Sequence, residues 1–382
     1  MIFLPLMNKI LFVNHSPLSV FHSVIPVHPE SSPGSILAEW ESPSNIALVK
    51  YWGKKEGQLP ANPSLSMTLS KAYTRTAVLA KTSNNSGGEV IVNGDPDHPF
   101  TPKLLKFIQW LVKEVPVLGK YSLEVITSNT FPHSAGIASS ASGISAFSLC
   151  LVTIISKITG KDIPGDEFYK IASFVSRMGS GSACRSIYGG FSVWGKTRGL
   201  PGSSDLVAVS INERIHSDLM KLHDAILVVS SSPKRISSSS GHELMNAHPF
   251  ANSRFEQAKT NIKAMLQALE SGDNDKLAAI SENEALTLHS LIMTSAGGPI
   301  LLEPGSMAIM RKIQEARKKG LRVFFSLDAG PNVHVLYPEN SAEPAEKFIR
   351  EELFQFCENG QVIWDRCGEG PLMSQTEDHT NP

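Results

Sequence analysis

The sequence has little cysteine. The four cysteines among its 382 residues are Cys150, Cys184, Cys357 and Cys367. None of them shows the C-x-x-C spacing of a zinc site, and their number is too low for a disulfide-rich scaffold. The cysteine content therefore excludes a small domain held together by zinc or by several disulfides. The simplest interpretation is a reduced, cytoplasmic protein that folds around ordinary hydrophobic cores.

The sequence also lacks an excess of either charge. Its formal net charge is -1 at pH 7, which argues against nucleic acid or a membrane surface as a partner. No uninterrupted apolar run reaches the ~18 residues needed to span a bilayer, and no internal repeat is visible. The length allows two domains, each with its own core. Any charge-driven binding is therefore expected in a local pocket.

The N-terminal segment lacks clear folding signals. Residues 1–27 are rather apolar, but Asn14, His15 and Pro17 interrupt what would be the apolar region of a signal peptide. We expect residues 1–35 to form a poorly ordered extension, with a targeting segment as the alternative.

Hydrophobic periodicity divides the rest of the chain into strands and helices. In the first half it predicts strands over residues 75–80, 89–92 and 121–127 and helices over residues 102–115, 138–158 and 164–177, the last with Pro164 in its first turn. In the second half it predicts strands over residues 225–229, 323–327, 333–337 and 362–364 and helices over residues 252–270, 275–293, 306–319 and 345–356. We place the boundary near residue 222, which gives domains over residues 36–222 and 223–382, each mixing helices with sheet.

A serine-rich loop leads directly into one of these helices. Residues 132–143 read Pro-His-Ser-Ala-Gly-Ile-Ala-Ser-Ser-Ala-Ser-Gly. Gly136 lets the backbone approach a ligand closely. Ser134, Ser139 and Ser140 add hydroxyl groups, and the free N–H groups of the first helical turn attract anions. The loop is thus typical of a phosphate cradle, although a helix that merely begins with serine caps explains the same residues.

A second motif places two lysines around an aromatic pair. Residues 42–55 read Ser-Pro-Ser-Asn-Ile-Ala-Leu-Val-Lys-Tyr-Trp-Gly-Lys-Lys, so that Lys50, Tyr51 and Lys54 follow a buried strand pattern. An ammonium supplies charge and a phenol a directed hydrogen bond, as a phosphate or diphosphate site requires. Ordinary surface and core positions are the alternative interpretation.

A third motif combines glycines, serines and an arginine. Residues 177–190 read Arg-Met-Gly-Ser-Gly-Ser-Ala-Cys-Arg-Ser-Ile-Tyr-Gly-Gly. Ser180 and Ser182 offer hydroxyl groups, and Arg185 offers a fork of N–H donors suited to a carboxylate. Cys184 has no histidine near it in the sequence, so we interpret it as a small buried thiol rather than a nucleophile.

A fourth motif ends a predicted strand with a carboxylate. Residues 324–332 read Phe-Phe-Ser-Leu-Asp-Ala-Gly-Pro-Asn, which places Asp328 before a Gly-Pro turn. Such an aspartate either forms the turn or points out of the sheet edge, where a reacting hydroxyl could reach it. His289, on a predicted long helix, is interpreted as structural.

Together these motifs resemble the superfamily of galactokinase, homoserine kinase, mevalonate kinase and phosphomevalonate kinase (the GHMP kinases), and within it the diphosphomevalonate decarboxylase family. The resemblance covers roughly residues 38–370 and includes Asn-Pro-Ser-Leu-Ser at 62–66. The serine loop alone indicates only the superfamily. The decarboxylase is indicated by Lys-Tyr-Trp-Gly-Lys at 50–54, Gly-Ser-Gly-Ser-Ala-Cys-Arg-Ser at 179–186 and Asp-Ala-Gly-Pro-Asn at 328–332.

The resemblance implies a two-domain α+β fold, with a ribosomal-protein-like N-terminal α/β domain, a ferredoxin-like C-terminal α+β sandwich and the active site in the cleft. It further implies ATP- and magnesium-dependent conversion of mevalonate diphosphate to isopentenyl diphosphate, ADP, phosphate and carbon dioxide, by a homodimer. Decarboxylation of mevalonate monophosphate and phosphorylation of mevalonate at the same hydroxyl remain alternatives. A nucleotide-binding protein without catalysis is the alternative from another class.

The resemblance also implies residue roles. Asp328 would deprotonate or orient the tertiary hydroxyl, Arg185 would hold the substrate carboxylate, and Lys54 completes the implied catalytic set. The residues implied in substrate binding are Tyr51, Lys54, Ser180, Ser182, Arg185 and Ser238. Those implied in ATP binding are Ser134, Ala135, Gly136, Ile137, Ala138, Ser139 and Ser140, with Ser139 also a candidate magnesium ligand.

One segment departs from the family's pattern. After Lys-Arg-Ile-Ser-Ser at 234–238, many bacterial relatives carry an arginine and, three residues further, a methionine, where this chain has Ser239 and His242. Lys234 or Arg235 could replace the missing charge, or the substrate could carry one phosphate fewer. His242 is interpreted either as an exposed loop histidine or as a ligand contact.

Overall fold

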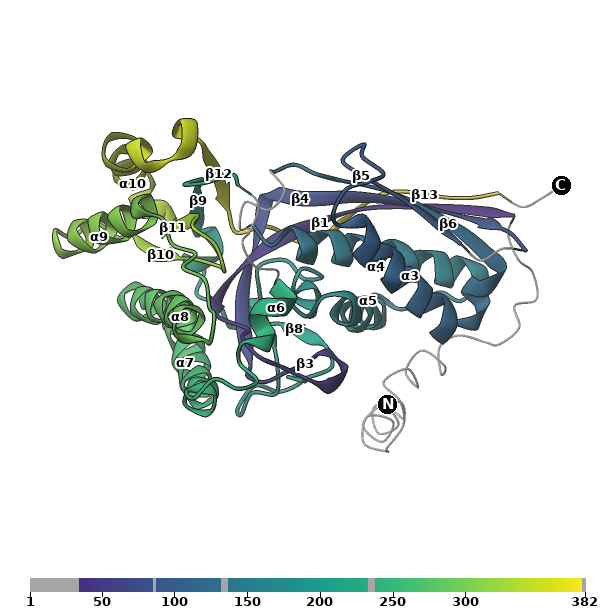
Figure 1. Ribbon diagram of the computed structural model, residues 1–382, viewed down its shortest axis with the longest axis horizontal. Helices are drawn as coiled ribbons and strands as arrows, with labels where there is room; N and C mark the ends of the chain where they lie inside the picture. The colour runs from purple at the N-terminus through teal and green to yellow at the C-terminus, as the bar shows by residue number, and fades with distance from the viewer. Residues whose placement is uncertain (1–33, 85–86, 132–136, 233–237, 380–382) are drawn as a thin grey trace.

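The structure is a computed structural model that describes residues 34–84, 87–131, 137–232 and 238–379. In this part of the chain a seven-stranded sheet and a four-stranded sheet are each packed against helices (Figure 1). The predicted N-terminal extension lies outside the described residues, except that Ser35 already begins the first strand.

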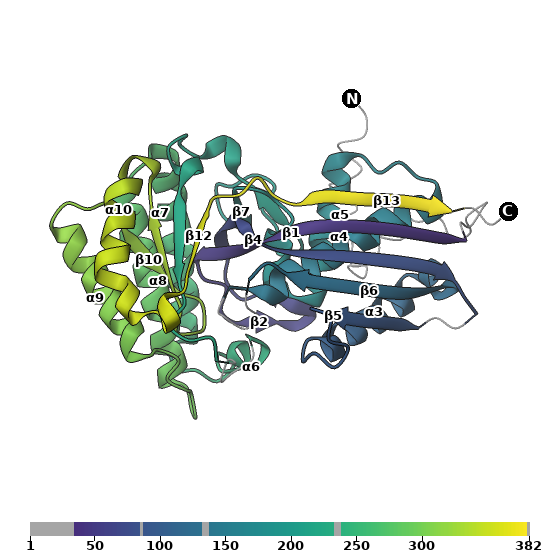
Figure 2. The same cartoon turned by 90° about the horizontal axis from the view of Figure 1, so that it is seen from above.

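The larger sheet has the strand order β13-β1-β4-β6-β5 (Figure 2). Strand β7 pairs with β4, and β8 pairs with β7. Its strands are β1 (Ser35–Val49), β4 (Ser64–Thr82), β5 (Gly88–Val92), β6 (Tyr121–Asn129), β7 (Phe191–Trp194), β8 (Ala208–Ser210) and β13 (Leu372–His379). One face carries α3 (Thr101–Glu114), α4 (Ser139–Thr159) and α5 (Gly165–Gly179) (Figure 1). The three strands and three helices predicted for this half are confirmed, with ends that shift and β4 much longer.

The alternation in β6 shows why this sheet has one covered face. Tyr121, Leu123, Val125 and Thr127 are buried, whereas the residues between them are half-buried or exposed. Successive side chains of a strand point to opposite faces, so the buried set lies under the helices. One local prediction was wrong: Pro164 lies at the N-cap position before α5 with an extended backbone, not in the first helical turn.

Helix α4 is the central helix of this half. By length and mean hydropathy, 1.7 over its most apolar window, it could cross a membrane, but 89% of that window is buried inside the protein. A count of uninterrupted apolar residues did not mark this helix as a possible membrane span, because serines interrupt its sequence. These serines are satisfied within the core: Ser145 Oγ lies 2.6 Å from Ser42 Oγ, for example. Helix α4 is therefore the core helix of this sheet.

The smaller sheet has the order β10-β11-β9-β12, and all its neighbouring strands are antiparallel. Its strands are β9 (His223–Leu227), β10 (Phe324–Ser326), β11 (Val333–Tyr337) and β12 (Val362–Arg366). The accompanying helices are α6 (Ser238–Glu243), α7 (Ala251–Ser271), α8 (Asn274–Thr294), α9 (Pro304–Lys318) and α10 (Ala342–Phe348). The prediction of one regular helix over residues 345–356 was wrong, because α10 ends at Phe348. A π turn (Ile349–Leu353) and a 3₁₀ turn (Phe354–Phe356) follow it.

Two features join the sheets. Strand β13 returns from the second half and pairs antiparallel with β1. The buried carboxylate of Asp365 in β12 accepts hydrogen bonds from the backbone N–H groups of Ser70 (2.8 Å) and Ala72 (2.7 Å) in β4. Strand β13 was not predicted from the sequence, since its residues are mostly exposed and polar. The domain division at residue 222 stays a prediction, and β13 crosses it.

Candidate active site

Lys50 follows the last residue of β1 and turns its side chain into the protein interior. Its side chain is 2% exposed. The ammonium donates to the carbonyl oxygen of Ala47 (2.7 Å), to Ser326 Oγ (2.9 Å) and to Asp328 Oδ1 (3.1 Å). All three donors of the ammonium are therefore used. Burial lowers the pKa of Lys50, and the adjacent Asp328 carboxylate opposes that change.

Asp328 follows β10, which ends at Ser326, two residues earlier than the predicted strand end. Its side chain is 24% exposed, so a ligand can reach it although Lys50 is buried behind it. Its backbone carbonyl oxygen lies 3.0 Å from Nε2 of His289 in α8. The fold therefore fixes this residue through both its side chain and its backbone.

Arg185 ends a 3₁₀ turn, η3 (Gly181–Arg185), and is almost completely buried. Its guanidinium donates to Ser66 Oγ (2.9 Å), Ser64 Oγ (2.6 Å) and Asn45 Oδ1 (3.4 Å). All three partners are neutral, and no carboxylate of the described residues forms an ion pair with it. Because a guanidinium has five N–H donors, it retains capacity for a carboxylate brought by a ligand.

The Tyr51 hydroxyl lies in an aromatic cluster beside this arginine. The ring centroid of Tyr51 is 4.6 Å from that of Trp194 and 4.1 Å from that of His242. Gly181 permits the packing, since a Cβ there would lie 2.9 Å from the Tyr51 hydroxyl oxygen. That hydroxyl is buried and has no hydrogen-bond partner among the described residues. A buried polar group without a partner marks a place where a ligand can supply one.

His242 is not an exposed loop histidine, and that interpretation was wrong. It lies in α6 with 6% of its surface exposed, against the rings of Tyr51 and Trp52. Its Nδ1 accepts a hydrogen bond from the N–H of Gly53 (3.0 Å), so the neutral ring carries its proton on Nε2. Burial lowers the pKa of His242 to about 3, and the positive charges of Lys54 and Arg185 act in the same direction.

At the start of α4, the N-cap residue itself provides no side-chain cap for the backbone N–H groups of the first turn. The N-cap residue is Ala138 in a left-handed conformation (φ 41°), and no side chain caps it. No serine of the described residues therefore occupies the N-cap position of this helix. Ser139 and Ser140 are half-buried in that turn, and Ile137 is buried just before it. Ser134, Ala135 and Gly136 lie outside the described residues.

The other predicted site residues surround the same region or lie outside the described residues. Lys54, in the short ribbon of β2 (Lys54–Lys55) and β3 (Leu59–Pro60), is half-buried, and burial lowers its pKa against the opposing charge of Glu243. Ser180 and Ser182 are half-buried on either side of Gly181. Ser238 begins α6, but its side chain is not among those described, nor is that of Ser239. Lys234 and Arg235 lie in a segment that the structure does not describe.

Comparison with known proteins decides the family. Residues 42–207 match the diphosphomevalonate decarboxylase-like N-terminal domain, and residues 225–378 match the mevalonate 5-diphosphate decarboxylase C-terminal domain. The diphosphomevalonate decarboxylase of Candida albicans is 32% identical over 314 residues, covering 78% of this chain and 83% of the relative. That of Saccharomyces cerevisiae is 31% identical over 326 residues, covering 81% and 79%. The chain belongs to the diphosphomevalonate decarboxylase family.

Solved structures agree with this assignment. The mevalonate diphosphate decarboxylase of Enterococcus faecalis matches with a TM-score of 0.75 and 28% identity, covering 89% of this chain and 99% of that one. A structure of MDDEF that holds MVAPP, AMPPCP and magnesium matches with the same TM-score, identity and coverage. The enzyme of Staphylococcus aureus matches with a TM-score of 0.75 at 27% identity, covering 89% and 98%. The family resemblance and the GHMP-kinase-type α+β fold predicted from the sequence are confirmed.

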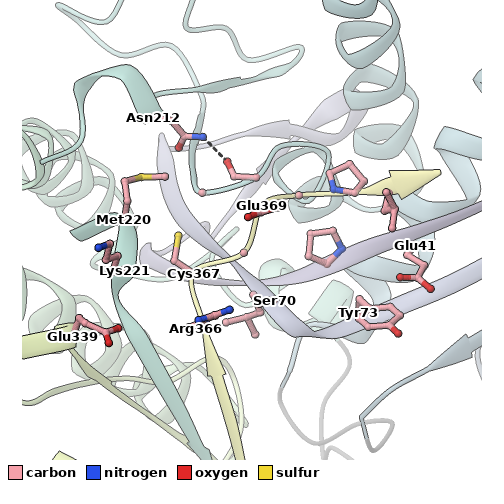
Figure 3. Close-up of a pocket in the computed structure, with 18 residues that line it drawn as sticks. Glu41, Ser70, Tyr73, Asn212, Met220, Lys221, Glu339, Arg366, Cys367 and Glu369 are labelled. Atoms are coloured by element: carbon pink, nitrogen blue, oxygen red, sulfur yellow. Dashed lines mark hydrogen bonds between the residues drawn. The ribbon is translucent and has the colours of Figure 1, made fainter. Parts of the chain in front are cut away.

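One large cavity is lined by other residues than this cluster. A cavity of about 1100 Å³ lies where the segment that joins β12 to β13 passes β4 (Figure 3). Labelled side chains around it include Lys221, Arg366 and Glu369, and an amide hydrogen bond from Asn212 Nδ2 to the Gly189 carbonyl closes part of its wall (3.0 Å). Lys50, Arg185 and Asp328 do not line it, although Pro43, Gly189 and Gly190 come from the segments that carry Lys50 and Arg185.

Sequence reasoning left several residues of this candidate site without a role. Ser64 and Ser66 belong to the Asn-Pro-Ser-Leu-Ser motif, yet only the structure shows that they bind Arg185. Lys50 was noted beside Lys54, but its pairing with Asp328 spans 278 positions of sequence. Cys184 is buried as predicted, and burial raises its pKa to about 12. Reactive thiols have a lowered pKa, so this environment agrees with the interpretation of Cys184 as a small buried thiol.

Replacing His242 by methionine should change the pH dependence of stability. The unfolded chain binds a proton to this histidine below about pH 6.5, whereas the folded site resists it until about pH 3. Wild-type stability should therefore fall as the pH falls through this window, by about 2 kcal/mol from His242 between about pH 6.5 and 5. His242→Met should lack this contribution. Urea unfolding of both proteins at several pH values measures it, and parallel pH dependences would contradict the predicted burial effect.

Proposed function

We propose that this protein catalyses the ATP- and magnesium-dependent decarboxylation of mevalonate diphosphate to isopentenyl diphosphate, ADP, phosphate and carbon dioxide, in isoprenoid biosynthesis by the mevalonate pathway. Membership of the decarboxylase family supports the reaction. The arrangement of Arg185 with Lys50 and Asp328 supports the roles given to individual residues.

The roles proposed for individual residues rest mainly on the buried guanidinium of Arg185. It is 2% exposed, and its described partners are two hydroxyls and an amide oxygen. A buried charge without a counter-charge costs several kcal/mol, and a guanidinium pairs best with a planar carboxylate. Burial lowers the pKa of Arg185, and the negative charge of Asp328 opposes that change. A substrate carboxylate bound here would thus lie beside Asp328.

In the first step Asp328 acts on the tertiary hydroxyl of the substrate. Its carboxylate accepts a hydrogen bond from the hydroxyl and takes the proton as the oxygen bonds to the γ-phosphorus of ATP, while ADP leaves. A crowded tertiary alcohol is a weak nucleophile, so alignment supplies much of the rate. The ion pair with Lys50 holds the carboxylate in one orientation for this step.

In the second step the new C–O–phosphate bond breaks and phosphate departs. Positive charge grows on the tertiary carbon. The C–C bond to the carboxylate then breaks, its electron pair forms the new double bond, and carbon dioxide leaves. Arg185 holds the carboxylate in the geometry for this elimination without protonating it, since a guanidinium stays charged and cannot act as an acid here.

The first turn of α4 fits the phosphates of ATP. Backbone N–H groups at a helix N-terminus and the hydroxyls of Ser139 and Ser140 are suited to phosphate oxygens. Among the described residues no cluster of three His, Cys, Asp or Glu side chains could hold a metal ion. Magnesium usually binds through few protein groups and substrate phosphates, so Ser139 would complete such a shell. Bound magnesium would neutralise charge on the transferred phosphate.

The distal phosphate of the substrate is assigned to the region around Tyr51, Lys54 and α6. The partnerless Tyr51 hydroxyl and the half-buried Lys54 ammonium are the donors there. His242 adds no charge, because it stays neutral at physiological pH. Decarboxylation of the monophosphate therefore remains the second candidate. A cytoplasmic location and a homodimer are further parts of the proposal.

The reaction is tested by supplying purified protein with ATP, magnesium and mevalonate diphosphate. Carbon dioxide, phosphate and ADP should appear in equal amounts. ADP without carbon dioxide would indicate a kinase, and no turnover would indicate a nucleotide-binding protein. The same assay with mevalonate monophosphate and mevalonate gives kcat/KM for each substrate. If the site is built for a diphosphate, kcat/KM should fall strongly when one phosphate is removed, since the buried donors are left unpaired.

Replacing Asp328 by asparagine should reduce kcat by at least ~10²-fold, because the amide cannot take the hydroxyl proton. The isosteric change keeps the shape of the side chain. The matched control is Asp205→Asn, whose carboxylate accepts from the backbone N–H of Lys196 (2.7 Å) outside the cluster. Its kcat should stay near that of the wild type. Near-normal turnover of Asp328→Asn would remove Asp328 from the mechanism.

A further inference from the structure

One helix contacts the backbone on both sides of the Lys50–Asp328 ion pair. Glu284 and His289 both lie in α8. The Glu284 carboxylate accepts a hydrogen bond from the backbone N–H of Lys50 (2.8 Å). Nε2 of His289 lies 3.0 Å from the backbone carbonyl oxygen of Asp328. Because a carbonyl only accepts, this nitrogen carries the proton and donates.

Glu284 is itself held rigidly. It forms an ion pair with Arg254 of α7, with contacts of 2.8 and 2.5 Å, and both side chains are at most 1% exposed. Asn261 Nδ2 donates to the same carboxylate (2.6 Å). Arg254 also donates to the backbone carbonyl oxygen of Lys50 (3.1 Å). The N–H and the C=O of Lys50 are thus both bound by the same buried pair.

These contacts exceed what the packing of α8 requires. Buried ion pairs are weak evidence for stability, because replacement by apolar residues of similar volume is often neutral or stabilising. Apolar residues could fill these positions, but they could not bind the peptide groups of Lys50 and Asp328. Reacting groups have to be held to within about 0.5 Å of their productive geometry. A rigid helix bonded to both partners meets that requirement.

We propose that Glu284 and His289 are positioning residues that set the placement of Lys50 relative to Asp328 through α8. Arg254 neutralises the charge of Glu284 and also binds the backbone of Lys50. The proposal rests on the proposed function, because it concerns the pair assigned to the first step. It adds that the alignment of this pair is set from α8, outside the motifs that identify the family.

The test compares three variants at His289. His289→Gln keeps an N–H donor where Nε2 lies, His289→Asn places its amide nearer the backbone, and His289→Leu has no donor. Misplacement by about 1 Å can cost 10²-fold, so kcat should fall between about 10- and 100-fold in His289→Leu. His289→Gln should recover most of the activity and His289→Asn less. KM for both substrates should change little, since the contact acts on alignment rather than on binding.

His248→Leu is the matched control. His248 is also a buried histidine, and its Nε2 lies 3.1 Å from Thr294 Oγ1 at the end of the same helix. Its loss should lower thermal stability without lowering kcat per folded molecule, with the folded fraction measured by circular dichroism. If His289→Leu does not fold, the comparison of the glutamine and asparagine variants takes its place.

A second arm asks whether His289 acts through Asp328. His289→Leu introduced into an Asp328→Asn enzyme should cost far less in kcat than in the wild type, because residues that act as a unit are not additive. Equal losses in both backgrounds would overturn the proposal. So would a kcat for His289→Leu no lower than that of His248→Leu, or equal activity of the glutamine and asparagine variants. Failure of the wild type to release carbon dioxide would instead overturn the proposed function.

Discussion

The ammonium of Lys50 lies where water cannot reach it, and a charge in such a place is tolerated only with a full set of partners. Those partners come from both sheets: the Ala47 carbonyl from β1, and Ser326 and Asp328 from the end of β10. Satisfying three donors at once restricts where β10 can lie relative to β1. The same ion pair thus joins the two halves of the fold and fixes the carboxylate assigned to the chemistry.

The positive charges of the site follow from this arrangement. Lys54 and Arg185 act on the neutral imidazole of His242, and Lys50 directly precedes Tyr51, in a chain whose formal net charge is only -1. Each cation has a different environment: Lys50 is neutralised by Asp328, Arg185 is held by neutral oxygens, and Lys54 is half-buried. This division suits a substrate that carries a carboxylate and phosphate groups and a co-substrate that carries three phosphates. The site therefore has a local positive charge that the net charge of the whole chain does not show.

Several features were predictable because they depend on residues that lie close together in the sequence. Hydrophobic periodicity found α3, α4, α5 and the strands of the smaller sheet, and the motifs around Arg185 and Asp328 indicated the family. His242 was misjudged because its partner Gly53 lies 189 positions away and the serines before it favour a loop. Glu284 was overlooked because a glutamate in a helical pattern is usually solvated. Strand β13 was missed because an exposed edge strand carries little apolar alternation.

The central claim is that Lys50 and Asp328 act as one unit. It is tested most directly by measuring kcat for decarboxylation in Lys50→Met, Asp328→Asn and the enzyme that carries both changes. If the two residues form one unit, the doubly changed enzyme should be no slower than the slower single variant, because removing either partner already destroys the arrangement. If the two losses multiply in the double variant, Lys50 and Asp328 contribute independently, and the claim that they act as one unit is contradicted.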